Sequence, residues 1–162
     1  DGVPHGTAHI WVVRKNGDKT YDLLLQKRSR GKDSYPGCYD ISSAGHVQAG
    51  DEFLPSAVRE LKEELGIEAR EEDLEFAGFH KGYMEDMFYG NMFRDSEVSA
   101  VYVYRKTVDA DQLTLQKEEV ESVMWMELGQ CVEAVKNHGI PNCIYLDELE
   151  MIERYLCRSQ EK

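Results

Sequence analysis

Short apolar stretches separated by turn residues dominate the chain and predict β-strands joined by tight loops. The first two stretches, 8–13 and 21–26, flank the turn residues 15–18 and predict a β-hairpin. Later apolar stretches predict further strands at 39–47, 74–83, 98–104 and 120–125. The hydrophobic pattern therefore describes a protein rich in strands.

Three stretches instead repeat apolar residues at helical spacing. In the first, Asp51 is a candidate N-cap, Pro55 is tolerated in the first turn, and Gly66 suits the left-handed residue that ends a helix. Its apolar stripe consists of Leu54, Val58, Leu61 and Leu65. Two more helices are predicted at 130–137 and 147–158. Strands mixed with helices predict an α/β fold with three layers.

Length and charge narrow the possible classes of function. A chain of 162 residues is expected to form a single domain, 1–162, and its start at Asp1 rather than Met is typical of a sequence that lacks a short N-terminal segment. No apolar run approaches the ~20 residues that span a bilayer. The net charge of −12 argues against a nucleic-acid polymer as partner, but a metal ion could still bring in a small phosphate-bearing substrate.

Four cysteines are scattered along the chain without a CxxC spacing. They are Cys38, Cys131, Cys143 and Cys157. Zinc binding or a redox pair is not indicated, and scattered reduced thiols are typical of a cytoplasmic protein.

The first predicted helix carries the chemistry, because Glu60, Glu63 and Glu64 fall within an arc of roughly 100° on one face. Unpaired like charges at this spacing each cost an isolated helix about 0.2–0.5 kcal/mol. A hard divalent cation such as Mg²⁺ turns that repulsion into attraction. Glutamate pairs are commonly just solvated helix faces. However, six fixed positions including Gly45 and Gly66 match by chance on the order of 10⁻⁵ per chain of this length.

At these positions the chain resembles the Nudix hydrolase family, whose signature is G-x5-E-x7-R-E-U-x-E-E-x-G-U, with U aliphatic. Gly45 opens the motif, Arg59-Glu60-Leu61 and Glu63-Glu64 follow, and Gly66-Ile67 closes it. One position departs from the pattern, since Asp51 stands where the family has its first glutamate.

The resemblance implies an α/β/α sandwich around a mixed sheet. It also implies hydrolysis of a diphosphate linked to another moiety, by attack of water at phosphorus. Mg²⁺ or Mn²⁺ would be held by Glu60, Glu63 and Glu64, with the carbonyl of Gly45, and Arg59 would hold the glutamates in place. The substrate would be a small diphosphate, and either a monomer or a homodimer is compatible with the sequence.

A further acidic residue is expected to complete the site as a metal ligand or as the general base. Glu97 precedes the predicted strand 98–104, with Asp95 two positions earlier on the same side of an extended chain. Glu119 is the rival, although its charged surroundings are also typical of a solvated loop. We favour Glu97 because apolar strand residues follow it.

A narrower resemblance connects the chain to the isopentenyl-diphosphate isomerase branch of the same superfamily. Pro36-Gly37 and Gly45-His46 match that pattern, but Ala44 stands where the isomerases carry their catalytic cysteine. Alanine has no proton to give, which argues against isomerase activity. His5, His9 and His46 also resemble isomerase histidines, and whether they bind metal is left open, as is a non-catalytic module that binds a nucleotide or another phosphometabolite.

The substrate beyond its diphosphate is also left open. Nucleoside triphosphates, nucleotide sugars, dinucleotides and prenyl diphosphates all suit the resemblance. Aromatic residues and methionines concentrate in 79–93 and could stack a nucleobase, or could simply pack as part of the core or a loop.

Overall fold

The computed structural model describes residues 5–17, 19–32, 35–88 and 91–160. Its strands are β1 (His5–Lys15), β2 (Tyr21–Arg28), β3 (Tyr39–Asp40), β4 (Ser43–His46), β5 (Leu74–Phe88), β6 (Asn91–Tyr104) and β7 (Val120–Glu127). Its helices are α1 (Phe53–Leu65), α2 (Leu128–Lys136) and α3 (Leu146–Gln160), with short 3₁₀ turns at Glu71–Asp73 and Ala110–Gln112.

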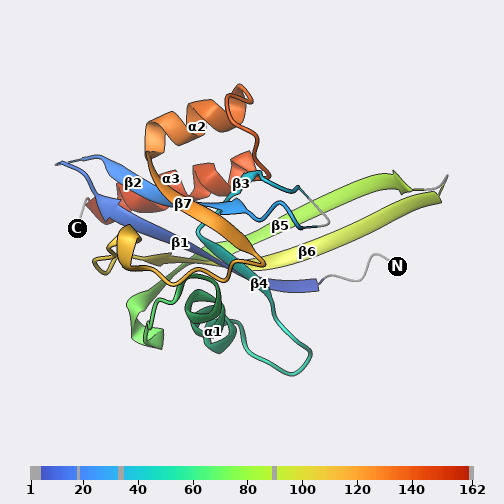
Figure 1. Cartoon of the computed structure of the whole chain (residues 1–162), viewed down its shortest axis with the longest axis horizontal. Helices are drawn as coiled ribbons and strands as arrows, with labels where there is room; N and C mark the ends of the chain where they lie inside the picture. Colours follow the sequence, from blue (N-terminus) through green and yellow to red (C-terminus); the bar gives the residue numbers. More distant parts are fainter. Residues whose placement is uncertain (1–4, 18, 33–34, 89–90, 161–162) are drawn as a thin grey trace.

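The seven strands form one mixed sheet around β1. β1 pairs in parallel with β6 and antiparallel with β4, and its far end pairs with β2. β5 and β6 make a long antiparallel hairpin that extends from the body of the molecule (Figure 1). β2 continues the sheet to β3 and β7.

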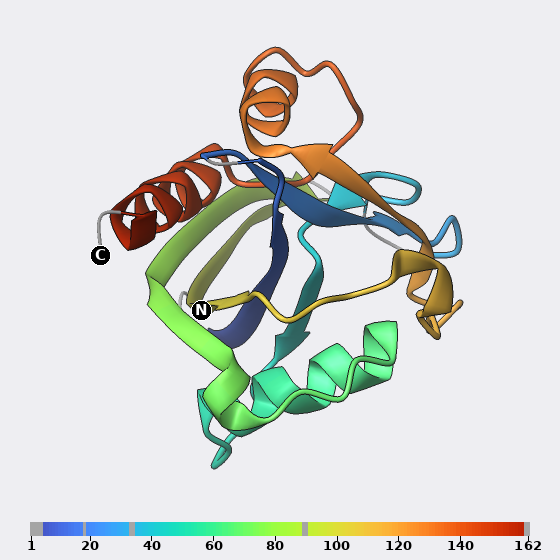
Figure 2. The same cartoon turned by 90° about the vertical axis from the view of Figure 1, so that its left-hand side faces the viewer.

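Helices cover both faces of the sheet, with α1 on one side and α2 and α3 on the other (Figures 1 and 2). The core is accordingly divided in two. Ala57, Leu61 and Leu65 of α1 pack against one face, and Leu149 and Ile152 of α3 pack against the other. The α/β/α sandwich with a mixed sheet is confirmed, and alternate β1 residues serve the two layers because successive strand side chains point to opposite faces.

Several predicted element boundaries are wrong, and β6 begins at Asn91, well before the strand expected at 98–104. The single strand expected at 39–47 is broken between β3 and β4, because the Ser42 hydroxyl accepts from the backbone N–H of Val12 and donates to the carbonyl of Leu24. A side chain that bonds the backbone in this way replaces the regular ladder. At α1 the N-cap is Glu52 rather than Asp51, with no side-chain capping bond, whereas Gly66 ends the helix at φ 72° as predicted.

The sequence also missed how α2 begins. Glu127 accepts from the backbone N–H groups of Gly129 and Gln130, so the helix starts at Leu128 rather than at residue 130. All four cysteines are free thiols. In the described part of the chain, no helix combines the length and apolar character needed to cross a bilayer.

Candidate functional site

Glu60 of α1 lies directly against β4, and Gly45 makes this close approach possible. A Cβ atom built on Gly45 would overlap the carboxylate group of Glu60. Only glycine leaves the backbone open for such contact. Glu60 of α1 therefore packs directly on β4, the strand that precedes this helix in the chain.

Glu64 lies on the same helix one turn further on, and the residue is only 7% exposed. Its Oε1 atom accepts from Ser43 Oγ at 2.7 Å, from the backbone N–H of Ala44 at 3.1 Å, and from Gln26 Nε2 at 3.3 Å. All three bonds end on the same oxygen, so Oε2 lies outside this set. Glu64 is thereby fixed between α1 and the sheet.

The expectation that all three helix glutamates face an open side is therefore wrong for Glu64. Glu63 is exposed, Glu60 is half-buried, and Glu64 is buried. The three residues occupy an arc of the helix that extends from its solvent-exposed side to its core-facing side. Glu64 lies at the core-facing end of this arc, where Gln26 of β2 and Ser43 of β4 donate hydrogen bonds to it.

Burial and mutual repulsion weaken the acidity of two of these carboxyls. Burial raises the pKa of Glu64 to about 7 against the bonds from Ser43 and Ala44, and the charge of Glu60 adds to the rise. Burial also raises the pKa of Glu60, with further contributions from the charges of Glu63 and Glu119. The site thus concentrates negative charge that is incompletely compensated by protein groups.

Carboxylate and carbonyl oxygens are the donors that hard divalent cations prefer. Among the residues that the structure describes, no three His, Cys, Asp or Glu side chains come close enough together to enclose a metal ion. Glu60 nevertheless lies against Gly45, Glu64 accepts from the neighbouring Ala44 amide, and the raised pKa values of Glu60 and Glu64 mark carboxylates that a cation would stabilise. The chemistry of these donors fits a divalent metal.

Arg59 lies beside the glutamates but pairs with the loop before the helix. Its Nη1 atom is 3.8 Å from Oδ2 of Asp51, and both side chains are partly exposed. The Arg59 charge also lowers the pKa of Glu60. The ion pair of Arg59 with Asp51 connects the loop before the helix to α1. The sequence led us to expect that Arg59 would contact the glutamates themselves.

The two candidates for an acidic residue outside the helix stand differently. The backbone of Glu97 pairs with that of His5 in the β1–β6 ladder, but its side chain lies outside the described part of the structure. Glu119 lies close enough to Glu60 for its charge to raise the pKa of Glu60, and it makes an ion pair with Lys32. The described geometry thus associates Glu119 with the site.

The three histidines also lie in different surroundings. His46 ends β4, is exposed, and its charge lowers the pKa of Glu60. His9 is buried and bonds Glu148 of α3 through Nδ1 at 2.9 Å. The backbone of His5 belongs to β1, but its side chain lies outside the described part of the structure.

Part of the aromatic stretch forms an exposed cluster near the start of α1. Phe79 is 59% exposed and meets Phe53 and Phe76 edge-on, with ring centroids 5.8 and 5.1 Å apart. The side chains of the residues from Gly82 to Phe93 lie outside the described part of the structure.

Sequence reasoning missed the residues that support the glutamates, namely Gln26, Ser43 and Lys32. A glutamine that follows the apolar run Leu23-Leu24-Leu25 was a usable signal, because a buried polar side chain in a strand needs a partner. No local pattern marks Lys32, whose partner Glu119 is far away in the sequence.

Comparison with known proteins shows the same family over most of the chain. The NUDIX domain model matches residues 3–144. An uncharacterized Nudix hydrolase of Clostridium acetobutylicum is 37% identical over 136 residues, which are 84% of this chain and 63% of that protein. Nudix hydrolase 3 of Arabidopsis thaliana is 40% identical over 129 residues, 78% of this chain but 16% of that protein.

An isopentenyl-diphosphate Δ-isomerase of Klebsiella pneumoniae is more distant, with 27% identity over 81% of this chain and 65% of its own. Among solved structures, the MutT protein of Methanosarcina mazei aligns with a TM-score of 0.64 at 16% identity, covering 100% of this chain and 99% of its own. That likeness concerns the fold alone. With the family model matched over most of its length, the chain belongs to the Nudix hydrolase family.

Proposed function

We propose that the protein is a metal-dependent pyrophosphohydrolase that cleaves a phosphoanhydride bond in a small diphosphate-containing substrate. The observation that carries the proposal is the packing of Glu60 onto Gly45, beside a buried Glu64 whose pKa is raised to about 7. A structural helix face would gain nothing from carboxylates placed so that they oppose each other's ionisation. A site for a divalent cation would.

In this proposal Glu60, Glu63 and Glu64 hold Mg²⁺ or Mn²⁺ together with the Gly45 carbonyl, and Glu97 or Glu119 completes the site. The bound metal would neutralise phosphate oxygens and activate water, which is what phosphoryl transfer chiefly requires. The protein residues would provide position. Ser43, Gln26 and the Ala44 amide fix Glu64, and the Arg59–Asp51 pair restrains the loop that enters the helix.

Product release from a panel of diphosphates, measured with Mg²⁺, with Mn²⁺ and with excess EDTA, tests the activity. The panel includes nucleoside triphosphates, nucleotide sugars, dinucleotides and prenyl diphosphates. We expect turnover of at least one class with metal and none with chelator. Full turnover in EDTA would contradict the proposal.

Metal binding can be measured separately from activity, as the rise in melting temperature caused by Mg²⁺ or Mn²⁺ without substrate. A cation that binds only the folded state stabilises it in proportion to its occupancy. Glu63→Gln should reduce the rise, whereas Glu133→Gln, an exposed glutamate on α2, should preserve it. Metal binding without turnover of any diphosphate would favour the alternative of a non-catalytic phosphometabolite-binding module.

The relationship to an isomerase supports a second candidate function, and one residue argues against it. Ala44 occupies the position where the isomerase pattern has its catalytic cysteine, and it offers no proton donor. We therefore expect no interconversion of isopentenyl and dimethylallyl diphosphate. Detection of isomer exchange by NMR with the purified protein would show this expectation to be wrong.

A further inference from the structure

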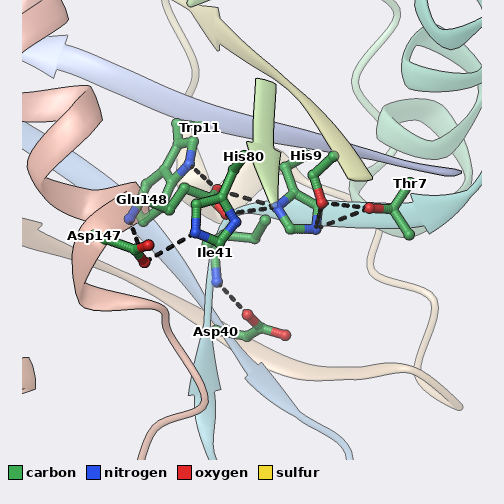
Figure 3. Close-up of polar contacts among 9 residues, drawn as sticks. Thr7, His9, Trp11, Asp40, Ile41, His80, Asp147 and Glu148 are labelled. Atoms are coloured by element: carbon green, nitrogen blue, oxygen red, sulfur yellow. Dashed lines mark hydrogen bonds and ion pairs between the residues drawn. The ribbon is translucent and has the colours of Figure 1, made fainter. Parts of the chain in front are cut away.

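A mostly buried polar cluster joins α3 to strands β1 and β5, on the sheet face opposite α1 (Figure 3). It consists of His9, His80, Asp147 and Glu148, together with the indole of Trp11. Glu148 is 1% exposed, His80 6% and His9 8%, whereas Asp147 lies at the surface. The proposed hydrolysis uses none of these side chains.

Glu148 is the centre of the cluster. Trp11 Nε1 donates to its Oε2 at 2.8 Å, and His9 Nδ1 lies 2.9 and 3.0 Å from its two oxygens. The other His9 nitrogen, Nε2, lies 3.3 Å from the hydroxyl of Ser99. Both ends of the His9 ring therefore have partners, and Ser99 is too buried, at 1% exposed, for this relay to act on a substrate.

His80 has a different arrangement, because within the described part of the chain only one of its ring nitrogens has a hydrogen-bond partner. Nε2 lies 2.9 Å from Oδ1 of Asp147, so it carries a proton that it donates to this carboxylate. Nδ1 is buried without a hydrogen-bond partner among the described residues, and it lies 3.6 Å from Oε1 of Glu148. If the ring is neutral, the lone pair on Nδ1 points toward the carboxylate of Glu148, and the two repel each other.

A second proton on His80 would convert this repulsion into an ion pair. The titratable groups that face it are Asp147 and Glu148 of α3, the phenol of Tyr145 whose ring packs 5.0 Å away, and His9 of β1 across Glu148. Asp40 of β3 also lies within reach of the His9 charge. The surroundings are rich in carboxylates, and a buried carboxylate is strongly unfavourable unless a cation pairs with it.

We infer that His80 takes a proton on Nδ1 and, as an imidazolium, bridges Asp147 and Glu148 to form a proton-dependent latch between β5 and the first turn of α3. The proton adds to a ring that already holds one on Nε2, so the latch gains one positive charge when it closes. It is closed at low pH and weakens as His80 loses the second proton on raising the pH. Protonation of His80 then couples the position of α3 to pH through both Asp147 and Glu148.

The test follows the ring nitrogens of His80 by NMR and the amide hydrogen exchange of α3 over about pH 5 to 9. We expect imidazolium nitrogen shifts at the low end of the range. We also expect the exchange of the first turn of α3, corrected for its intrinsic pH dependence, to accelerate about tenfold as the second proton is lost. A His80 ring that stays neutral throughout, or exchange that ignores its titration, would overturn the inference.

Variants separate the latch from general packing. His80→Gln should abolish the pH dependence of α3 exchange, while His138→Asn, which removes an exposed imidazole at a positive φ of 53° that asparagine tolerates, should retain it. If His80→Gln fails to fold, Asp147→Asn at the exposed end of the cluster serves instead. It should shift the loss of the second His80 proton to lower pH, and an unchanged titration would count against the bridge.

Discussion

At the scale of single residues, the site depends on how close two side chains come to one strand. Glu60 occupies the space that any side chain on Gly45 would need, and Glu64 places Oε1 where the Ser43 hydroxyl, the Ala44 amide and the Gln26 amide converge. Burial raises the pKa of both carboxyls, and the three hydrogen bonds to Glu64 offset only part of that rise.

Gly45→Ala should reduce the proposed hydrolysis far more than it reduces stability. The new methyl group would force the Glu60 carboxylate away from β4, whereas the rest of α1 is held by its buried leucines. A displaced electrostatic group costs about 100-fold in turnover. Gly139→Ala is the matched control, since its Cβ would make only ordinary contacts with Ala134. Equal rates for both variants would place the critical contact elsewhere.

Glu64→Gln should change how the metal-free protein responds to pH. Because the pKa of Glu64 rises from 4.5 to about 7 on folding, the folded state keeps a proton that the unfolded state has lost. The stabilising effect of that proton is complete below pH 4.5, falls as pH rises, and is gone above about 7. Glutamine does not titrate, so the variant should escape this fall.

Urea unfolding in EDTA gives the free energy of unfolding of both proteins at several pH values. As the pH rises from 4.5 to about 7, the free energy of unfolding of Glu64→Gln should increase by roughly 3 kcal/mol relative to that of the wild type. Parallel curves would mean that Glu64 is not the residue that titrates. With metal present, the same variant should lose at least about 100-fold in turnover.

At the scale of elements, the site lies where α1 meets β4. Two other elements, β6 and the loop before β7, each carry a candidate for the further acidic residue. Glu119 precedes β7 and affects the pKa of Glu60, while Lys32 from the segment after β2 holds its carboxylate. Glu97 belongs to β6, which runs parallel to β1. The sequence favours Glu97, whereas the effect of the Glu119 charge on the pKa of Glu60 favours Glu119.

Kinetics of Glu97→Gln and Glu119→Gln at saturating Mg²⁺ decide between the two. From the sequence we expect Glu97→Gln to show the greater loss, of about 100-fold, because the residue that completes the site stabilises charge that develops in the reaction. Glu118→Gln, an exposed neighbour, is the control and should keep the wild-type rate. Collapse of Glu119→Gln alone would transfer the role to the loop before β7.

At the scale of the whole molecule, the mixed sheet separates two layers with different tasks. The proposed metal site lies on the α1 side, and the polar cluster around Glu148 lies beneath α3 on the other. Each layer has its own apolar core, although both contain residues of β1. A defect in one core should therefore lower global stability without altering the chemistry of the opposite face.

Leu149→Ala tests this separation. Leu149 is fully buried, so the cavity and the lost contacts should cost about 2–5 kcal/mol of unfolding free energy. Well below the lowered melting temperature, metal affinity and turnover per folded molecule should match the wild type. Leu61→Ala in α1 should cost similar stability but also weaken metal binding, because Leu61 lies between Glu60 and Glu64. Equal functional loss in the two variants would show that the layers are coupled.

The sequence by itself determined the family motif, the strands and the three helices, because hydrophobic periodicity and glycine punctuation are local properties. Gly66 ends α1 and Leu61 and Leu65 face the core as their spacing predicted. Only the tertiary structure decided that Glu64 is buried, that Ser42 interrupts a strand, and that Glu148 meets His9 across 139 positions. These outcomes depend on partners distant in the chain, and a carboxylate's burial, bonds and pKa exist only once folding has brought those partners together.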